Sequence, residues 1–427
     1  MGGYLARAES SKGIHDPLFA RALVLDDGAE RVAIVTADLA AIDTSLAHSV
    51  RRRIESETGI PASHTLIALS HTHSGPLVAP RRLGTPDLSY LESLQNHLAA
   101  AARAALESPR PVRIATGSGK VYLGINRRER TPENRIVIGR NPKGYCSPFA
   151  RILAIADEHA GPIAVLFTYG AHPVILGPDN LEISGDYAGH AERVIEENYG
   201  DTAVALFALG LAGDVNANFE HRTFDEVEIF GTALGRAVLE KMKEIDYTTD
   251  ATLRVRTCHV DLPLQSTPSV DEAERILFRE RQRLSGILGH GEDRTEINQR
   301  RLMVEWASHL VELASLPDPP TTATLELQGI RIGETAIVAF SAEVFAEYEK
   351  ILKEMSPFPH TIAISNANGN IGYLPVAAAF DEGGYEVDMA PRLFGALPFR
   401  PDVETHVRQG IARLLADLAA EEAPPLP

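Results

Sequence analysis

The sequence predicts an α/β fold in which mixed sheet layers are covered by helices. Two observations predict it. Short apolar runs that read as buried strands alternate with longer segments whose apolar residues recur at helical spacing, through about residue 270. In addition, four of the apolar runs end in histidine, acidic or amide residues, as expected where a sheet presents its strand ends to a ligand.

The elements follow in order. Strands are predicted where short apolar runs are bounded by turn residues, and helices where the apolar spacing changes to that of a helix. The predicted strands are 31–38, 65–70, 112–116, 150–156, 163–169, 203–208 and 251–262. The predicted helices are 44–58, 89–107, 186–198 and 225–245.

Residues 270–316 are densely charged and helical, with a break at 286–291, and predict an inserted helical hairpin. Its charge predicts a solvated face, with a lid or a subunit contact as the alternative. Prolines at 317–320 end it. Further strands are predicted at 321–329 and 335–340, which we expect to pair, and at 361–365, and helices are predicted at 344–353 and 403–420. Because the candidate site residues extend from 71 to 385, we expect a single catalytic domain over residues 1–427.

Composition limits the partners. The 427 residues carry 41 basic and 58 acidic side chains, a net charge of −17, which argues against nucleic acid and anionic membranes. Two cysteines, Cys146 and Cys258, predict free thiols in a reducing compartment. Neither a signal peptide nor an apolar run long enough for stable membrane insertion is visible. We expect a cytoplasmic protein, although the start is open to truncation, and a homo-oligomer is possible.

His71 and His73 directly follow the apolar run at 65–70. On a continuing strand, side chains at i and i+2 point to the same face, so the two imidazoles are expected to lie together. Two imidazoles on one face suit a metal ion with its bound water. The alternative is a pair of polar residues that cap a strand end.

Three other strand-like runs end in similar residues. His172 follows the run at 163–170, Asp214 and Asn216 follow 206–210, and Glu343 follows 335–340. Nitrogen and oxygen ligands of this kind suit zinc. For Glu343, the sequence alone also allows a carboxylate that stabilises the first turn of a helix.

The chain resembles the neutral, non-lysosomal ceramidase family. The resemblance rests on short motifs in the family's order, which cover about residues 3–400. They are 13–22 (GIHDPLFARA), 70–76 (SHTHSGP), Asn126-Arg127, 171–173 (AHP), 213–216 (GDVN), 341–343 (SAE), Tyr373 and Tyr385.

The resemblance implies one zinc ion per chain, held by His71, His172, Glu343 and Tyr373. It also implies that His73 contacts the zinc-bound water as general base, and that Tyr385 faces the substrate carbonyl. Two alternatives stay open from the residues: His73 as a third histidine ligand, and Tyr373 as an aromatic packed at a turn.

For three further catalytic candidates the residues allow more than one role. Asp214 could orient a ligand histidine, handle a proton or cap a turn. Arg127 could hold an anionic or carbonyl group, or be a surface arginine. Asn216 could donate its amide to a carbonyl oxygen.

The chain departs from the family at the catalytic turn. Ceramidases resemble Gly-Asp-Val-Ser-Pro-Asn there, whereas this chain has Gly-Asp-Val-Asn-Ala-Asn at 213–218. Asn216 cannot act as a serine-type nucleophile. We also expect that the 427 residues hold no C-terminal β-sandwich (Ig-like) domain of the kind that follows the catalytic domain in ceramidases. Both departures favour a substrate smaller or more polar than ceramide.

The sequence therefore predicts a zinc-dependent hydrolase of lipid metabolism that cleaves an N-acyl amide by attack of zinc-bound water. Its partner would be a small-molecule amide or ester. The alternatives are a zinc-dependent esterase or lactonase acting on a small soluble substrate, and an inactive metal-binding relative.

Overall fold

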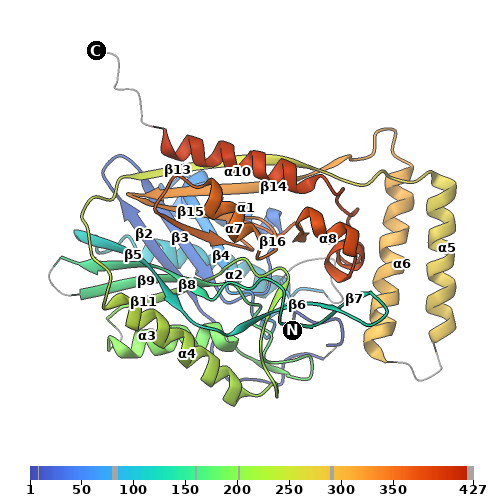
Figure 1. Cartoon of the computed structure of the whole chain (residues 1–427), viewed down its shortest axis with the longest axis horizontal. Coiled ribbons are helices and arrows are strands. Elements are labelled where there is room, and N and C mark those ends of the chain that lie inside the picture. Colours follow the sequence, from blue (N-terminus) through green and yellow to red (C-terminus); the bar gives the residue numbers. More distant parts are fainter. Residues whose placement is uncertain (8, 79–84, 159–160, 201, 289–292, 421–427) are drawn as a thin grey trace, which may run out of the picture.

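Helices lie outside and sheets lie inside in the computed structural model (Figure 1). The structure describes residues 1–7, 9–78, 85–158, 161–200, 202–288 and 293–420. The helix α10 covers one face of the stack, and α3 and α4 cover the opposite face. The predicted α/β class with mixed sheets is confirmed.

The first sheet has the order β2-β3-β4 and carries the end from which His71 projects. Its antiparallel pair β2–β3 is followed by the parallel pair β3–β4. Two helices cover its outer side. The strands are Ala20–Asp26 (β2), Arg31–Ala37 (β3) and Thr65–Leu69 (β4), and the helices are Thr44–Thr58 (α1) and Leu88–Ala104 (α2).

The second sheet has the order β11-β9-β8-β5, in which β9 and β11 are parallel and lead towards His172 and Asp214. Its strands are Val112–Lys120 (β5), Phe149–Asp157 (β8), Gly161–Tyr169 (β9) and Val204–Leu209 (β11). Its covering helices are Asp186–Asn198 (α3) and Phe224–Met242 (α4).

The third sheet has the order β13-β14-β15-β17. The predicted pairing of the segments near 321–329 and 335–340 is confirmed, because β14 and β15 are antiparallel neighbours. The strands are Leu253–Pro263 (β13), Thr322–Ile332 (β14), Thr335–Phe340 (β15) and His360–Ile364 (β17). The helices packed on its outer face are Tyr348–Met355 (α7) and Val403–Ala419 (α10).

One apolar cluster joins the inner faces of all three sheets, with Leu66, Leu166 and Ile337 among its fully buried members. The outer faces of the same strands are buried under helices. Strands that are buried on both faces need a nearly continuous apolar sequence, which is why these strands could be predicted from the sequence. The stacked sheets therefore form the rigid frame from whose strand ends the candidate site projects.

Short strands and turns complete the site end of the frame. The described residues include three small sheets: β12-β6-β7, the pair β16–β18 and the pair β1–β10. Their strands are Gly13–Ile14 (β1), Gly124–Arg130 (β6), Ile136–Asn141 (β7), Glu182–Ile183 (β10), Val215–Ala217 (β12), Glu343–Val344 (β16) and Tyr373–Leu374 (β18). The short helices are Ala62–His64 (η1), Ala377–Glu382 (α8), Ala390–Leu393 (α9) and the π-helix Tyr385–Met389 (η2).

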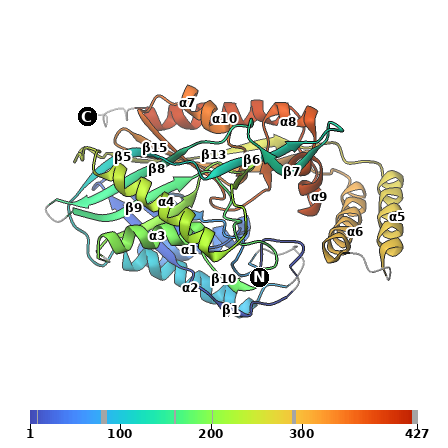
Figure 2. The same ribbon diagram turned by 60° about the horizontal axis from the view of Figure 1, so that its bottom comes forward.

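The predicted hairpin is confirmed as α5 (Val270–Ile287) and α6 (Arg294–Ala314). It projects from one end of the molecule, with α5 outermost (Figures 1 and 2). The α6 helix packs on the segment around α9, where the Trp306 indole donates to the carbonyl of Ala396 at 3.1 Å. Residues 289–291 of the predicted break lie outside the described part. On α5, Arg275 pairs with Glu272 on an exposed surface, which fits the solvated face expected for the charge.

The predicted helix at 344–353 begins later, at Tyr348, because Glu343 and Val344 pair with β18 instead. The strands β2, β6 and β7 were not predicted. In β6 the sequence GINRRER carries too few apolar residues for a strand pattern to be visible.

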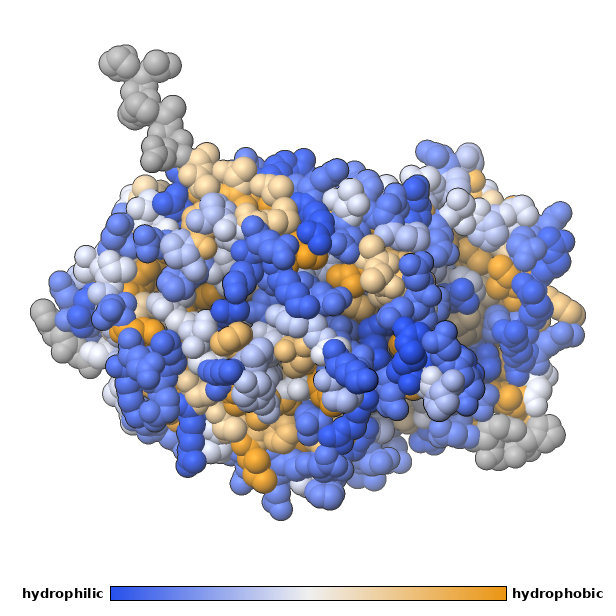
Figure 3. Space-filling model, in the orientation of Figure 1, coloured by the Kyte–Doolittle hydropathy of each residue, from blue (hydrophilic) through white to orange (hydrophobic). Residues whose placement is uncertain are grey.

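The surface is mostly hydrophilic on the face seen in Figure 3, with hydrophobic residues scattered over it. Among the described helices, none combines the length and apolar character that crossing a bilayer requires.

Candidate metal centre

The His71–His73 segment leaves the sheet before the first histidine. β4 ends at Leu69, and His71 has a left-handed backbone with φ of 64°. The prediction that the two imidazoles share a strand face was therefore wrong. They come together in a turn, held where the His71 amide donates to the carbonyl of Leu39 at 3.0 Å. A left-handed non-glycine residue costs about 1–2 kcal/mol, so the surrounding fold has to hold it.

Three imidazoles converge at this end of the frame. One ring nitrogen from each of His71, His73 and His172 lies within 4.8 Å of the others. The Nε2 atoms of His71 and His73 are 3.3 Å apart. His71 and His172 are almost fully buried, and His73 is partly exposed. The predicted association of the two strand ends is thus observed, and the group could hold a metal ion.

Backbone carbonyls orient two of the rings. Nδ1 of His71 contacts the carbonyl of Ala40, and Nδ1 of His172 lies 2.8 Å from the carbonyl of Ala212. A carbonyl only accepts, so each Nδ1 carries the proton. Each Nε2 lone pair then points into the cluster, which is the arrangement that metal-binding histidines adopt.

Glu343 adds a carboxylate to the cluster. Its Oε2 lies 3.6 Å from Nε2 of His71 and 3.4 Å from Nε2 of His172. The side chain is 2% exposed. Its position in β16 contradicts the expectation that it heads a helix. Because β16 pairs with β18 in register, Glu343 stands directly beside Tyr373.

The surroundings of His73 favour its neutral form. Burial, followed by the neighbouring His71 and His172, lowers the pKa of His73 well below its ordinary value. The segment at residues 2–7 packs against it: the Tyr4 ring meets the His73 ring edge-on at 5.1 Å, and Arg7 donates to the His73 carbonyl at 2.6 Å. A neutral imidazole can accept a proton or bind a metal.

Arg127 enters the cluster from β6. Its Nη1 is 3.4 Å from Nε2 of His172 and donates to Oδ1 of Asn216 at 3.3 Å. The guanidinium lies 5.2 Å from the ring centre of Tyr373 and 5.9 Å from that of Tyr385. Arg127 is 5% exposed, which excludes the alternative of a surface arginine.

The two tyrosines lie together beside Arg127. Their ring centres are 5.8 Å apart and the rings meet edge-on. Burial raises the pKa of Tyr373 well above its ordinary value, although Arg127 opposes the shift. The Tyr373 phenol is therefore neutral unless a metal ion stabilises the phenolate.

Glu386 is a buried partner that sequence reasoning missed. It is 1% exposed and accepts from Arg127 at 2.8 Å and from Arg128 at 2.9 Å. Burial opposes its charge, but the two arginines outweigh this and lower the pKa of Glu386. Glu386 follows Tyr385 in the π-helix η2, and its place directly after a predicted site residue was the only available signal.

Asp214 and Asn216 have different positions. The oxygens of Asp214 accept from Asn126 Nδ2 at 2.6 Å and from the Ala346 amide at 2.8 Å. Burial raises the pKa of Asp214 to about 6. Its contacts are those of a residue that fixes the turn after β11 to the segment before α7. Asn216 lies beside His172, where the two backbones form a bridge.

The donor set fits zinc. Imidazole nitrogen and carboxylate oxygen are among the ligands that zinc takes, and here the Nε2 atoms of His71 and His172 lie 3.6 and 3.4 Å from Oε2 of Glu343. Tyr373 adds a phenol next to Glu343.

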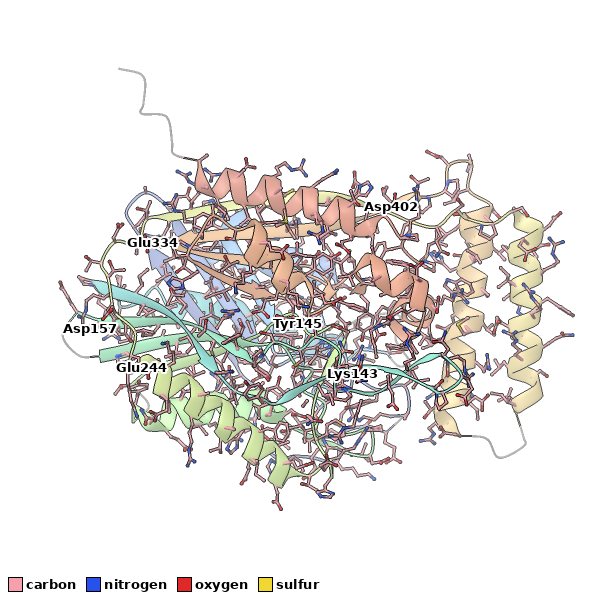
Figure 4. All side chains as sticks on the ribbon, in the orientation of Figure 1. Lys143, Tyr145, Asp157, Glu244, Glu334 and Asp402 are labelled. Atoms are coloured by element: carbon pink, nitrogen blue, oxygen red, sulfur yellow. The ribbon has the colours of Figure 1, made fainter. Side chains whose placement is uncertain are left out.

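Two of the cavities among the described residues border this region. One of about 200 Å³ has mostly apolar walls, among them Tyr373, Ile371 and Leu313 of the hairpin. The other, of about 590 Å³, is charged and lined by Arg128, Lys143, Tyr145 and other residues near β6 and β7. Figure 4 labels two of these side chains, Lys143 and Tyr145. The apolar cavity reaches a predicted metal ligand directly.

Comparison with known proteins shows which family the sequence matches. Residues 1–229 match the family model of the neutral/alkaline non-lysosomal ceramidase N-terminal domain. The chain is 25% identical to the neutral ceramidase of Pseudomonas aeruginosa over 231 residues, which are 51% of this chain and 34% of that protein. It is 25% identical to neutral ceramidase A of Dictyostelium discoideum over 246 residues, 51% of this chain and 33% of that protein. The matched part thus spans about a third of the length of these relatives.

Solved structures show the same fold over the whole chain. The crystal structure of the Pseudomonas aeruginosa neutral ceramidase superposes with a TM-score of 0.72 at 19% identity and covers 100% of this chain and 73% of that one. A ceramidase complexed with C2 gives a TM-score of 0.72 at 18% identity, with 100% and 74% covered.

Proposed function

Because the chain belongs to the neutral/alkaline non-lysosomal ceramidase family, we propose that it is a zinc-dependent hydrolase that cleaves an N-acyl amide. The observation that carries the proposal is the convergence of His71, His73 and His172 on one point beside the Glu343 carboxylate. In this proposal His71, His172, Glu343 and Tyr373 hold the zinc ion. When bound, zinc polarises a carbonyl group and lowers the pKa of a water ligand towards about 7.

The remaining residues prepare the site for hydrolysis. His73, neutral and beside the ligand histidines, accepts the proton from the attacking water. Arg127 holds a permanent positive charge at the cluster, and among the described contacts its Nη2 makes no hydrogen bond, which leaves it available to the carbonyl oxygen as that oxygen gains charge. Tyr385, beside Arg127, faces the same oxygen in this proposal.

A short acyl group is the substrate class that the surroundings support. The apolar cavity at Tyr373 has about 200 Å³, below the roughly 300–1,000 Å³ of pockets for drug-sized ligands. Asn216 stands at the turn where a serine is expected in ceramidases, and its amide cannot carry an acyl group. The substrate would therefore be smaller than a long-chain ceramide.

The proposed function is tested with zinc-loaded protein and a matched set of short N-acyl amides, esters and lactones. We expect turnover of the amides that a chelator abolishes and added zinc restores. Faster turnover of the esters or lactones would mean that the protein is an esterase or a lactonase and not an amidase. Turnover that continues unchanged in the chelator would exclude a metal-dependent mechanism.

The His73→Ala variant is expected to keep its zinc and to lose about 10²–10⁴-fold in kcat, the usual contribution of a general base. Zinc content and kcat are measured on the same preparation. His97→Ala, an exposed histidine of α2, serves as the control and should match the wild type. A His73→Ala protein without zinc would make His73 a ligand instead.

Turnover is expected to proceed without an acyl-enzyme, since Asn216 offers no nucleophile. Rapid quenching during steady-state turnover, followed by mass spectrometry of the intact protein, should show the unmodified mass only.

In the same assay, a short N-acyl amide should react faster than long-chain ceramide. A trapped acyl adduct would refute direct attack by water, and equally fast ceramide turnover would refute the substrate size.

A further inference from the structure

The segment between β17 and β18, residues 365–372, is wound so tightly that four of its residues have a positive φ. We call it the asparagine loop. Asn366 and Asn368 have φ of 52° and 58°, and Gly369 and Gly372 have φ of 132° and 102°. Asparagine tolerates this backbone better than other side chains. The winding brings three asparagine side chains back towards the sheets.

Asn368 ties the loop to the strand that leads to His71. The side-chain Oδ1 of Asn368 accepts from the backbone amide of Ile67 at 2.9 Å. The backbone amide of Asn368 donates to the carbonyl of Ile67 at 2.9 Å. Its Nδ2 donates to Gln328 on β14 at 2.8 Å. The loop is thereby fixed relative to β4 and the third sheet.

Asn370, on the same fixed loop, hydrogen-bonds to Glu343. Its Nδ2 donates to Oε1 of Glu343 at 3.1 Å and to Oδ1 of Asn366 at 2.7 Å. Its Oδ1 accepts from the Gly372 amide at 2.7 Å. Both ends of the Asn370 amide are engaged, so it cannot rotate without breaking hydrogen bonds. With Oε1 held on this side, Oε2 is the oxygen that faces His71 and His172.

We infer that Asn370 is a positioning residue for the Glu343 carboxylate, which it orients towards the metal ion. The inference rests on the proposed metal-dependent function. A ligand that is free to rotate loses conformational entropy when it binds, and hydrogen bonds to its outer oxygen remove that cost in advance. Residues that orient metal ligands in this way contribute about 10–100-fold to metal affinity.

The test is a double-mutant cycle on zinc affinity, measured with metal-stripped protein by competition with a chelating dye. Asn370→Ala is expected to weaken zinc binding about 10–100-fold in the wild-type background. In the Glu343→Gln background, Asn370→Ala should change the affinity by about twofold or less, since a residue that acts through Glu343 loses its effect with it. If Asn370→Ala weakens zinc binding by the same factor in the wild-type and Glu343→Gln backgrounds, the inference is overturned.

Two further variants separate positioning from folding. Asn370→Asp has nearly the same shape but donates no hydrogen bond to Glu343, and it should lose affinity as well. Asn134→Ala, an exposed asparagine at the turn between β6 and β7, is the matched control and should bind zinc like the wild type. The melting temperature of each metal-free variant is recorded beside its affinity, and a metal-free protein that melts like the wild type but binds zinc weakly supports positioning.

The outcomes also separate this inference from the proposed function. Wild-type protein that binds zinc, with Asn370→Ala and Asn370→Asp of unchanged affinity, overturns the positioning role alone. Wild-type protein that takes up no zinc overturns both.

Discussion

Replacing His71 or His172 by alanine is expected to empty the metal site. Each variant removes an imidazole whose Nδ1 is fixed on a backbone carbonyl and whose Nε2 lies within 3.6 Å of Glu343. The loss of zinc affinity should exceed the roughly 10–100-fold loss that follows when a residue that only orients a metal ligand is replaced. Elemental analysis of protein purified without added metal should give one zinc per wild-type chain and almost none in either variant.

The control for these two variants is His48→Ala, an exposed histidine of α1, which should retain its zinc and its activity. Activity and zinc content should fall together in the His71 and His172 variants. An active His172→Ala protein without metal would contradict the proposed mechanism.

Glu386→Gln is expected to cost about 3–5 kcal/mol of unfolding free energy, the usual loss when one member of a buried ion pair is removed. The variant leaves Arg127 and Arg128, 5% and 6% exposed, without their shared carboxylate. Urea unfolding at pH 7 measures the loss. The control is Glu382→Gln, which also pairs with Arg128 but is 38% exposed in its side chain and should cost about 1 kcal/mol or less.

The pH dependence of the same pair has a definite sign. The folded pKa of Glu386 is lowered, so its stabilisation is present above the unfolded value of about 4.3 and is lost as the pH falls through the folded value. Acid should therefore narrow the stability difference between wild type and Glu386→Gln. A difference that stays constant down to the acid transition would show that the ion pair contributes no net stability.

The sheets were predictable because they are buried on both faces. β3, β4, β9 and β15 are almost continuous apolar runs, and short buried runs of this kind are what sequence patterns detect most easily. β6 was missed since its arginines are satisfied by distant carboxylates, such as the Glu386 partner of Arg127 and Arg128. A local sequence pattern cannot reveal an ion pair between residues that lie so far apart in the chain.

The candidate site was predictable in its membership more than in its geometry. The four strand ends with His71, His172, Asp214 and Glu343 were visible, and three of these four residues meet. The backbone that brings them together was not visible, because the left-handed φ of His71 and the two-residue strand of Glu343 depend on tertiary contacts. For the same reason, the role of Asp214 in fixing a turn and the asparagine loop behind Glu343 emerged only from the structure.

The convergence of the cluster on the ends of three different sheets has a consequence for biosynthesis. His71 follows a strand of the first sheet, His172 a strand of the second and Glu343 a strand of the third. Domains fold as units, and the sheets have to dock before these side chains can meet. On a growing chain the three histidines can therefore meet once the first two sheets dock, whereas the complete donor set has to wait until Glu343 has emerged. We expect metal loading to be completed late, so that protein synthesised without added zinc is an intact apoprotein that zinc activates afterwards.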